Sequence, residues 1–145
     1  MKTPVTSDTL VALGDIALGI VCPMANEATT AVGFVNEVLD ECGSQTFKSV
    51  NFFAVIDRAS RDNTLDLLLE LSKRRQGLHV IWSPENRNIV DAYVRGYREA
   101  LSSGCDWILE IDAGYSHQPS EIPQFFSRMK EGYACVFGSR FCNGG

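Results

Sequence analysis

The chain has 145 residues, of which 45% are hydrophobic and 21% charged, and its formal net charge is −5 at pH 7. These values are typical of one globular domain with its own core, and they exclude disordered and low-complexity proteins. An acidic chain without a clustered basic face does not fit a nucleic-acid-binding protein. Five cysteines without a C-x-x-C pair, together with only two histidines, argue against a Cys/His zinc site and favour a reduced, cytoplasmic setting.

The stretch from Leu10 to Ala25 is almost wholly apolar and needs separate treatment. It is shorter than the roughly 20 residues of a membrane-spanning helix, and Asp15 interrupts it. We therefore expect no membrane span in this chain, and a buried strand over residues 16–22 instead.

Apolar runs and helical spacings alternate along the rest of the chain. The predicted elements are strand 16–22, helix 28–42, strand 51–56, helix 62–75, strand 78–82, helix 88–101, strand 106–111, helix 120–130 and strand 134–137. The residues expected on the buried faces of the second and third helices are Leu65, Leu68, Leu69 and Ser72, then Val90, Tyr93, Val94, Tyr97 and Leu101. Cys22 and Cys135 lie in apolar runs and are expected to be buried.

This order predicts a three-layer α/β/α, Rossmann-like domain with a mostly parallel sheet, spanning residues 1–145 as one unit. In such sheets the ligand binds beyond the carboxyl ends of the strands, where the strand order reverses. Polar residues that directly follow strands are therefore the candidate functional residues.

Acidic residues follow several of these strands. Asp57 ends the second strand, and Glu110 and Asp112 end the fourth, where their side chains should point the same way because strand side chains alternate. Asp112 favours a functional role, whereas Asp57 fits a turn as well as a ligand contact. Asn26 and Asp62 also suit helix N-caps. Four residues thus remain open between structural and functional roles at this point: Asn26, Asp57, Asp62 and Glu110.

Other chemistries lack their motifs. The sequence contains no G-x-G-x-x-G after the first strand, no G-x-x-x-x-G-K-[ST] phosphate loop and no G-x-S-x-G nucleophile elbow. A dinucleotide-binding oxidoreductase is therefore disfavoured. Phosphates would have to be held largely by a metal ion and an arginine.

Five segments together resemble the family 2 glycosyltransferases of GT-A fold, including polyprenyl-phosphate sugar transferases. The resemblance covers about residues 16–145. The matching residues are Pro23, Asn26 and Glu27 (P-A-Y-N-E), Asp57, Ser60, Asp62 and Thr64 (V-D-D-G-S-x-D-x-T), Asn86, Arg87, Ala92 and Gly96 (N-R-G-x-x-x-A-x-x-x-G), Asp112, Ala113, His117 and Pro119 (D-A-D-x-x-H-x-P), and Gly138, Ser139 and Arg140 (G-S-R).

The resemblance implies a role for several residues. Pro23, Asn26 and Glu27 would line the nucleotide pocket, with Asp57, Arg58 and Arg87 as further donor-binding residues. Asp112 would belong to a Mg²⁺ or Mn²⁺ site at the donor diphosphate, and Arg140 would lie near a phosphate. The partners implied are a nucleoside-diphosphate sugar and a lipid-phosphate or glycan acceptor.

The sequence departs from the family pattern at two positions. Arg58 stands where the second aspartate of the D-D pair is expected, which leaves the nucleotide open. Gly114 replaces the last carboxylate of D-A-D, which weakens the expected metal site. Asp112 could then bind the ion with help from Glu110 or His117.

The family places its catalytic base after the G-S-R segment, so no catalytic residue can be named here. We expect the chain to be the donor-binding part of an inverting transferase, with any membrane association belonging to a longer parent protein. A non-catalytic nucleotide-binding or interaction module with a decayed metal site is the alternative. A part of the sheet left uncovered should expose an edge and favour a homo-oligomer.

Overall fold

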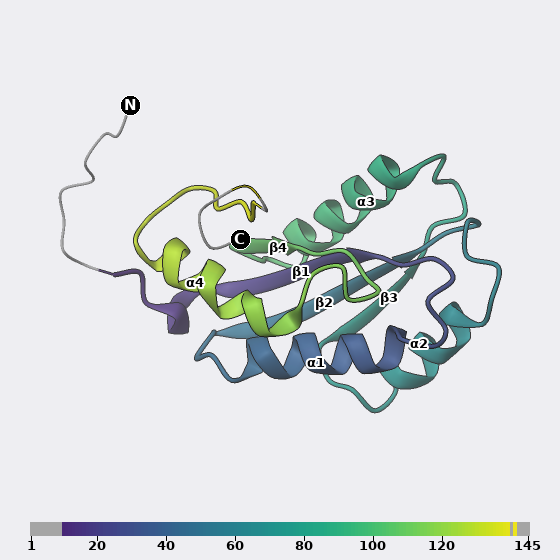
Figure 1. Cartoon of the computed structure of the whole chain (residues 1–145), viewed down its shortest axis with the longest axis horizontal. Coiled ribbons are helices and arrows are strands. Elements are labelled where there is room, and N and C mark those ends of the chain that lie inside the picture. The colour runs from purple at the N-terminus through teal and green to yellow at the C-terminus, as the bar shows by residue number, and fades with distance from the viewer. Residues whose placement is uncertain (1–9, 140, 142–145) are drawn as a thin grey trace.

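A four-stranded parallel sheet forms the centre of the computed structural model, which describes residues 10–139 and 141 (Figure 1). The strands are β1 (Ala17–Pro23), β2 (Ser49–Ile56), β3 (Leu78–Trp82) and β4 (Trp107–Glu110), arranged in the order β3-β2-β1-β4. Every residue of β1 is buried, as expected for a strand with neighbours on both edges and helices on both faces. The predicted α/β fold with a parallel sheet is confirmed.

Four helices cover the two faces of the sheet. They are α1 (Ala31–Gly43), α2 (Thr64–Ser72), α3 (Ile89–Ser102) and α4 (Ile122–Lys130), with short 3₁₀ turns at Leu13–Asp15 and Pro119–Glu121. Figure 1 shows α1, α2 and α4 on one face and α3 alone on the other, and a separate apolar cluster lies on each side. Within the described part of the chain, every helix is too short or too polar to cross a membrane.

Small side chains let α3 lie close against the sheet. Ala92, Gly96 and Ala100 form its buried face, and a Cβ atom on Gly96 would come within 2.3 Å of a Val21 methyl group. The predicted buried face of this helix is right only for Tyr93 and Tyr97, which are half-buried and pack against the apolar cluster beneath it. Val90 and Leu101 are each 63% exposed, because close contact between helix and strand selects small residues over the larger apolar ones.

Three further expectations were wrong. Residues 134–137 form no strand, since an apolar run needs a neighbouring strand to complete its hydrogen bonds and none pairs with it among the described residues. Cys135 lies in that segment and is exposed rather than buried. In α2 the buried leucines are Leu68 and Leu71, whereas Leu69 is 43% exposed.

Candidate functional site

The strand order reverses between β1 and β4. From β1 the chain adds β2 and then β3 on one side of the sheet, and α3 then carries it back to place β4 on the other side of β1. All four strands are parallel, so their carboxyl ends meet at one edge of the sheet. This is the position at which open α/β sheets bind ligands. The polar residues found there fall into two groups, one after β1, β2 and β3 and the other after β4.

Asn26 joins the loop after β1 to the loop after β2. Its Nδ2 donates to the carbonyl of Ala59 at 3.1 Å, its Oδ1 accepts from the backbone N–H of Arg61 at 2.8 Å, and its own N–H donates to Ser60 Oγ. Asn26 has a φ of 57°, a left-handed conformation that asparagine tolerates better than most residues. Asn26 therefore holds two loops together instead of capping a helix.

Thr64 and Asp62 complete this connection. The buried Thr64 hydroxyl accepts from the N–H of Glu27 at 2.9 Å and donates to Asp62 Oδ1 at 2.5 Å. Asp62 also accepts from the N–H groups of Ala28 and Thr64, both at 3.0 Å. The Thr64 hydroxyl, followed by these N–H donors and Ser60, lowers the pKa of the Asp62 carboxyl. The hydrogen bonds of Asp62 and Thr64 therefore fix the two loops at the rim of the site.

An open pocket of about 370 Å³ lies beyond the ends of the first two strands and beside the start of α3. It is lined by Pro23, Met24, Ala25, Val55, Asp57, Arg58, Ala59, Asn86, Arg87, Asn88 and Ile89. Asp57 is half-buried, and one of its carboxylate oxygens accepts from the N–H of Ala59 at 2.9 Å. The pocket thus offers a carboxylate, two guanidinium groups and apolar walls, a combination that suits the base and ribose of a nucleotide.

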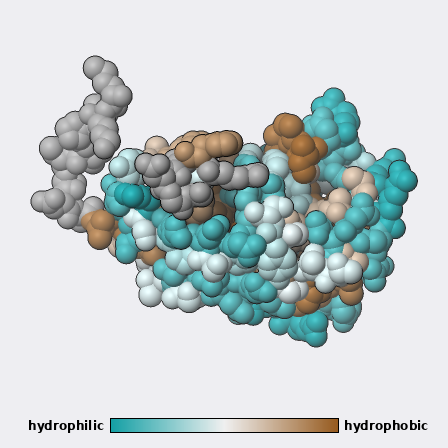
Figure 2. Space-filling view, in the orientation of Figure 1, coloured by the Kyte–Doolittle hydropathy of each residue, from teal (hydrophilic) through white to brown (hydrophobic). Residues whose placement is uncertain are grey.

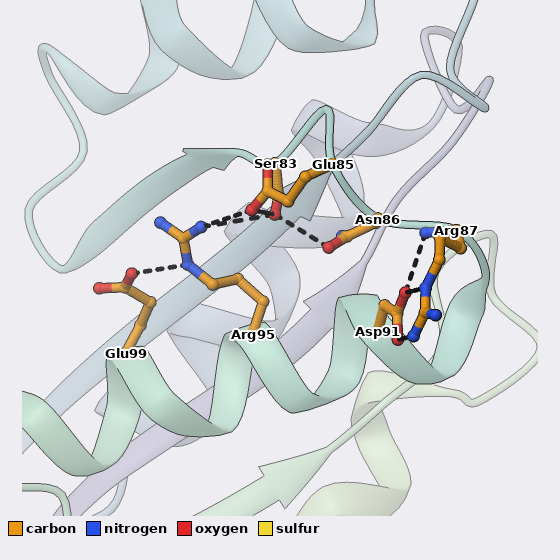
Figure 3. Close-up of polar contacts among 7 residues, drawn as sticks. All are labelled: Ser83, Glu85, Asn86, Arg87, Asp91, Arg95 and Glu99. Atoms are coloured by element: carbon orange, nitrogen blue, oxygen red, sulfur yellow. Dashed lines mark hydrogen bonds and ion pairs between the residues drawn. The ribbon is translucent and has the colours of Figure 1, made fainter.

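Arg87 is held at the rim of this pocket by Asp91. Its Nε and a terminal nitrogen lie 2.9 and 3.3 Å from the two carboxylate oxygens, and its backbone N–H also donates to Asp91 (Figure 3). Asn88 caps α3 by accepting from the N–H of Asp91 at 3.0 Å. The Arg87 side chain is still 82% exposed, so it could meet a ligand while keeping this pair.

A polar network behind the pocket connects the end of β3 to α3 (Figure 3). Arg95 donates to Glu99 at 2.8 Å and to Glu85 at 3.0 Å, and the fully buried Ser83 hydroxyl lies 2.6 Å from Glu85 and 3.0 Å from Asn86 Oδ1. Ser83 has one proton and can donate to only one of these acceptors. Asn86 Nδ2 is buried without a partner among the described residues; exchanging the two ends of its amide would let it donate to Ser83. The network fixes the pocket wall that carries Asn86.

The second group of polar residues lies around Asp112, just after β4. The Tyr93 hydroxyl, on α3, donates to Asp112 Oδ1, and the backbone N–H of Asp112 donates to His117 Nδ1 at 3.1 Å. A second tyrosine of α3 makes a similar contact: the Tyr97 hydroxyl donates to Glu110, two residues before Asp112. Glu110 and Asp112 therefore do point the same way, toward successive turns of α3. Burial, then the hydrogen bond to Asp112, raises the pKa of Tyr93, so this phenol stays a proton donor.

Glu27 lies beside Gly114 and is the carboxylate that enters this second group. A Cβ atom built on Gly114 would be 3.1 Å from Glu27 Oε1 and 3.2 Å from Oε2, and Gly114 has a φ of 75°. Burial raises the pKa of the Cys22 thiol, and the carboxylates of Asp112 and Glu27 raise it further. These two carboxylates therefore lie around the end of β1, and Glu27 is next to Gly114, which comes two residues after Asp112.

The sequence model described as "Glycosyl transferase family 2" matches residues 19–145, which is most of the chain. The chain belongs to glycosyl transferase family 2. Its four-stranded parallel sheet with flanking helices is consistent with this family's fold.

Relatives in this family include named sugar transferases. The chain is 33% identical over 91 residues to an undecaprenyl-phosphate mannosyltransferase of Micrococcus luteus, covering 63% of this chain and 37% of that protein. It is 34% identical over 91 residues to a dolichol-phosphate mannosyltransferase of Pyrococcus furiosus, covering 63% and 25%. A polyprenol monophosphomannose synthase of Mycolicibacterium smegmatis is 30% identical over 92 residues, covering 63% and 35%. The chain thus spans between a quarter and two-fifths of these relatives' length.

The structure brings some of the candidate residues together and separates others. Pro23, Asp57, Arg58 and Arg87 line one pocket. Glu27 lies with Asp112 near β4, whereas the Asn26 side chain is engaged by the loop after β2. Arg140 lies outside the described residues. Tyr93 was treated as a core residue, and its contact with Asp112 could be found only by knowing how α3 crosses the sheet.

Proposed function

We propose that this chain is the donor-binding part of an inverting glycosyltransferase that uses a nucleoside-diphosphate sugar. The observation that supports this most directly is the arrangement of Asp57 and Asp112, which follow β2 and β4 on either side of the central β1. The nucleoside would occupy the pocket lined by Asp57, Arg58 and Arg87. The diphosphate and sugar would then extend toward Asp112 across the end of β1.

The sugar and the acceptor are proposed from the relatives. Their names specify mannose transfer to lipid phosphates, so we propose mannose as the first sugar to test and a polyprenyl phosphate as the acceptor, with a glycan as the second choice. In the reaction an acceptor oxygen attacks the anomeric carbon as the bond from that carbon to the β-phosphate oxygen breaks. The nucleoside diphosphate leaves with the electron pair. A polyprenyl-phosphate oxygen attacks in its ionised form, whereas a glycan hydroxyl would give its proton to a base that has no assignment in this chain.

A divalent cation fits the oxygen donors at this site. The described residues contain no cluster of three or more His, Cys, Asp or Glu side chains arranged to hold a metal. A Mg²⁺ ion bound through substrate phosphates needs only one or two carboxylates from the protein, and Mn²⁺ accepts the same donors. We propose Asp112 for this role, with Glu27 as the second carboxylate because it lies beside Gly114, where the last carboxylate of D-A-D is missing. Each already accepts one hydroxyl hydrogen bond, Asp112 Oδ1 from Tyr93 and Glu27 Oε2 from Thr30. When bound, the ion would neutralise charge on the leaving diphosphate.

The alternative is a non-catalytic nucleotide-binding or interaction module. Gly114 favours it, because no side chain at that position can reach a cation, and Arg58 favours it by reversing a charge in the pocket. Self-association, a cytoplasmic setting and membrane association of a longer parent protein also stay proposals.

Calorimetric titration with UDP, GDP and their mannose conjugates, each with and without Mn²⁺, separates these functions. Donor binding that depends on Mn²⁺ and is lost in Asp112→Ala supports the transferase. Tyr97→Phe is the matched control, since it removes the neighbouring phenol without touching Asp112. Nucleotide binding that ignores both Mn²⁺ and the Asp112 substitution supports the non-catalytic nucleotide-binding module. No binding to any of these ligands contradicts the transferase and supports the interaction module.

A further inference from the structure

The solvent-facing side of α3 carries a continuous apolar stripe. Val90, Val94, Tyr97 and Leu101 follow one another at spacings of four, three and four residues. Tyr97 is half-buried at the border of this stripe, where it also packs against the apolar cluster beneath the helix. Val90 and Leu101 are 63% exposed and Val94 is 37% exposed. Figure 2 shows apolar side chains at the surface in the region of α3. Isolated exposed apolar residues are ordinary, but an aligned stripe along a whole helix is not.

This spacing is the one by which two α-helices pack side chains against each other. Apolar residues that alternate between four and three residues apart form the contact line of a coiled coil. A helix of 14 residues is about 21 Å long, which is enough for two such layers of contact. The stripe therefore fits another helix better than it fits a small ligand.

The charges beside the stripe favour a second copy of this chain as that partner. Asp91 and Arg98 lie on the same flank of the stripe, near its opposite ends. Arg98 makes no ion pair within the described part of the chain, whereas Asp91 already holds Arg87. When two copies of α3 run antiparallel, each Arg98 approaches Asp91 of the other copy, and both pairs form at once. A surface that complements itself in this way is what a two-fold dimer requires.

We propose that two copies of this chain associate through α3, packed antiparallel about a two-fold axis. Val90 of one copy faces Leu101 of the other, and Val94 faces Tyr97. Stable interfaces typically bury roughly 800 Å² on each partner, and one helix face offers less than that. The dimer should therefore be weak and in exchange with monomer. This proposal does not rest on the proposed function, since α3 association is measured without nucleotide.

Sedimentation velocity over a range from about 1 µM to about 1 mM, which spans weak association constants, tests the proposal. The wild-type chain should shift from monomer toward dimer as its concentration rises. Val94→Asp and Leu101→Asp should each abolish this shift. Leu69→Asp is the matched control, because Leu69 is an exposed leucine on α2, across the sheet, and this variant should dimerise normally.

A charge exchange gives an independent test. Asp91→Lys and Arg98→Asp should each weaken self-association, because like charges then meet at both ends of the interface. An equimolar mixture of the two variants should recover it, since every pair is again opposite in sign. Circular dichroism checks that the Asp91 variant keeps α3, because this substitution removes the hydrogen bonds that the Asp91 carboxylate accepts from Arg87 at the start of the helix. A wild-type chain that stays monomeric at every concentration overturns the proposal, as does association that survives both Val94→Asp and Leu101→Asp.

Discussion

The carboxylate of Glu27 lies so close to Gly114 that a Cβ atom there would be 3.1 Å from one of its oxygens. Gly114→Asp, which restores the family's usual residue, should therefore destabilise the protein. The left-handed backbone costs a non-glycine residue about 1 kcal/mol or more, and two carboxylates would repel each other. Gly114→Asn is the matched control, because it shares the backbone cost without the charge. In thermal melting without metal, Gly114→Asp should have a lower melting temperature than Gly114→Asn. Equal melting temperatures would show that the repulsion between the two carboxylates is negligible.

Tyr93 is expected to position Asp112 for cation and nucleotide binding. Tyr93→Phe removes the hydroxyl that donates to Asp112 and should weaken Mn²⁺-dependent nucleotide binding by roughly 3- to 10-fold, the range of one lost hydrogen bond. Tyr97→Phe, which frees Glu110 instead, should leave that affinity unchanged. Calorimetry measures both. Tighter binding in Tyr93→Phe would mean that the phenol competes with the cation for the carboxylate.

The buried hydroxyl of Thr64 should contribute measurably to the free energy of unfolding through its hydrogen bonds. Thr64→Val keeps the shape but leaves the Glu27 N–H without its acceptor and removes one of the donors to Asp62 Oδ1, which costs about 1–3 kcal/mol. Urea denaturation at pH 7 measures this loss. Thr46→Val, at an exposed position, is a control that should change little. An unchanged free energy of unfolding in Thr64→Val would show that water replaces the hydroxyl.

The same hydrogen bonds predict how stability depends on pH. The pKa of Asp62 is lower in the folded chain than in the unfolded one, chiefly through Thr64. The unfolded chain therefore binds more protons below neutral pH. The stabilisation from Asp62 is present above the unfolded pKa and is lost as pH falls through the lowered folded pKa. Asp62→Asn should flatten the fall in unfolding free energy between about pH 5 and pH 2, and an unchanged slope would contradict this.

Gly96, the single glycine of α3, should not tolerate a side chain. Gly96→Ala places a methyl group 2.3 Å from Val21 and should cost about 1–3 kcal/mol or more by overpacking. Gly43→Ala, at the end of α1 with no atom within 4 Å of the new methyl, should cost nothing measurable. The double variant Gly96→Ala/Val21→Ala should recover part of the loss. Thermal melts decide, and equal melting temperatures for the two single glycine variants would contradict the close packing of α3.

Cysteine reactivity should separate Cys135 from the buried thiols. Burial, and to a smaller extent Glu41, raises the pKa of Cys42 to about 12, so roughly 10⁻⁴ of this thiol is ionised at pH 8. Cys22 and Cys105 are buried too, whereas Cys135 is exposed. Iodoacetamide in native buffer should therefore modify Cys135 well before Cys22, Cys42 or Cys105, as peptide mass mapping can show. Modification of Cys42 at a rate close to that of Cys135 would indicate frequent opening of α1.

The sequence was enough to predict four strands of the sheet, because short apolar runs such as 51–56 between turn residues are typical of buried strands, but the run 134–137 gave a fifth strand that does not form. It also located Asp57 and Asp112 at strand ends, since parallel strands present those ends together. The predicted bounds of β3 agree with the structure at both ends. The resemblance supplied the family, which the sequence comparison confirmed.

What could not be predicted depends on contacts between distant segments. The inward face of α3 follows from how closely it approaches Val21, and spacing alone favoured Val94 and Leu101 instead. Asn26 was open between a cap and a ligand contact because its true partners lie more than thirty residues away. The contact between Glu27 and Gly114 could not be predicted, because it depends on the paths of the loops after β1 and β4, and no local sequence pattern specifies those paths.

Because β1 is central, the part of the site after β1 and β2 can form earlier during synthesis than the part after β4. β1 can pair with β2, and β2 with β3, once the chain has been made as far as Trp82. The other edge of β1 waits for β4, where Ala17 and Asp106, joined by a hydrogen bond, are 89 residues apart. Contacts of such separation form late, because a longer loop must close first. We expect the nucleoside pocket to exist on the ribosome before Asp112 arrives, so a nascent chain could hold the base of its ligand before it can hold the phosphates.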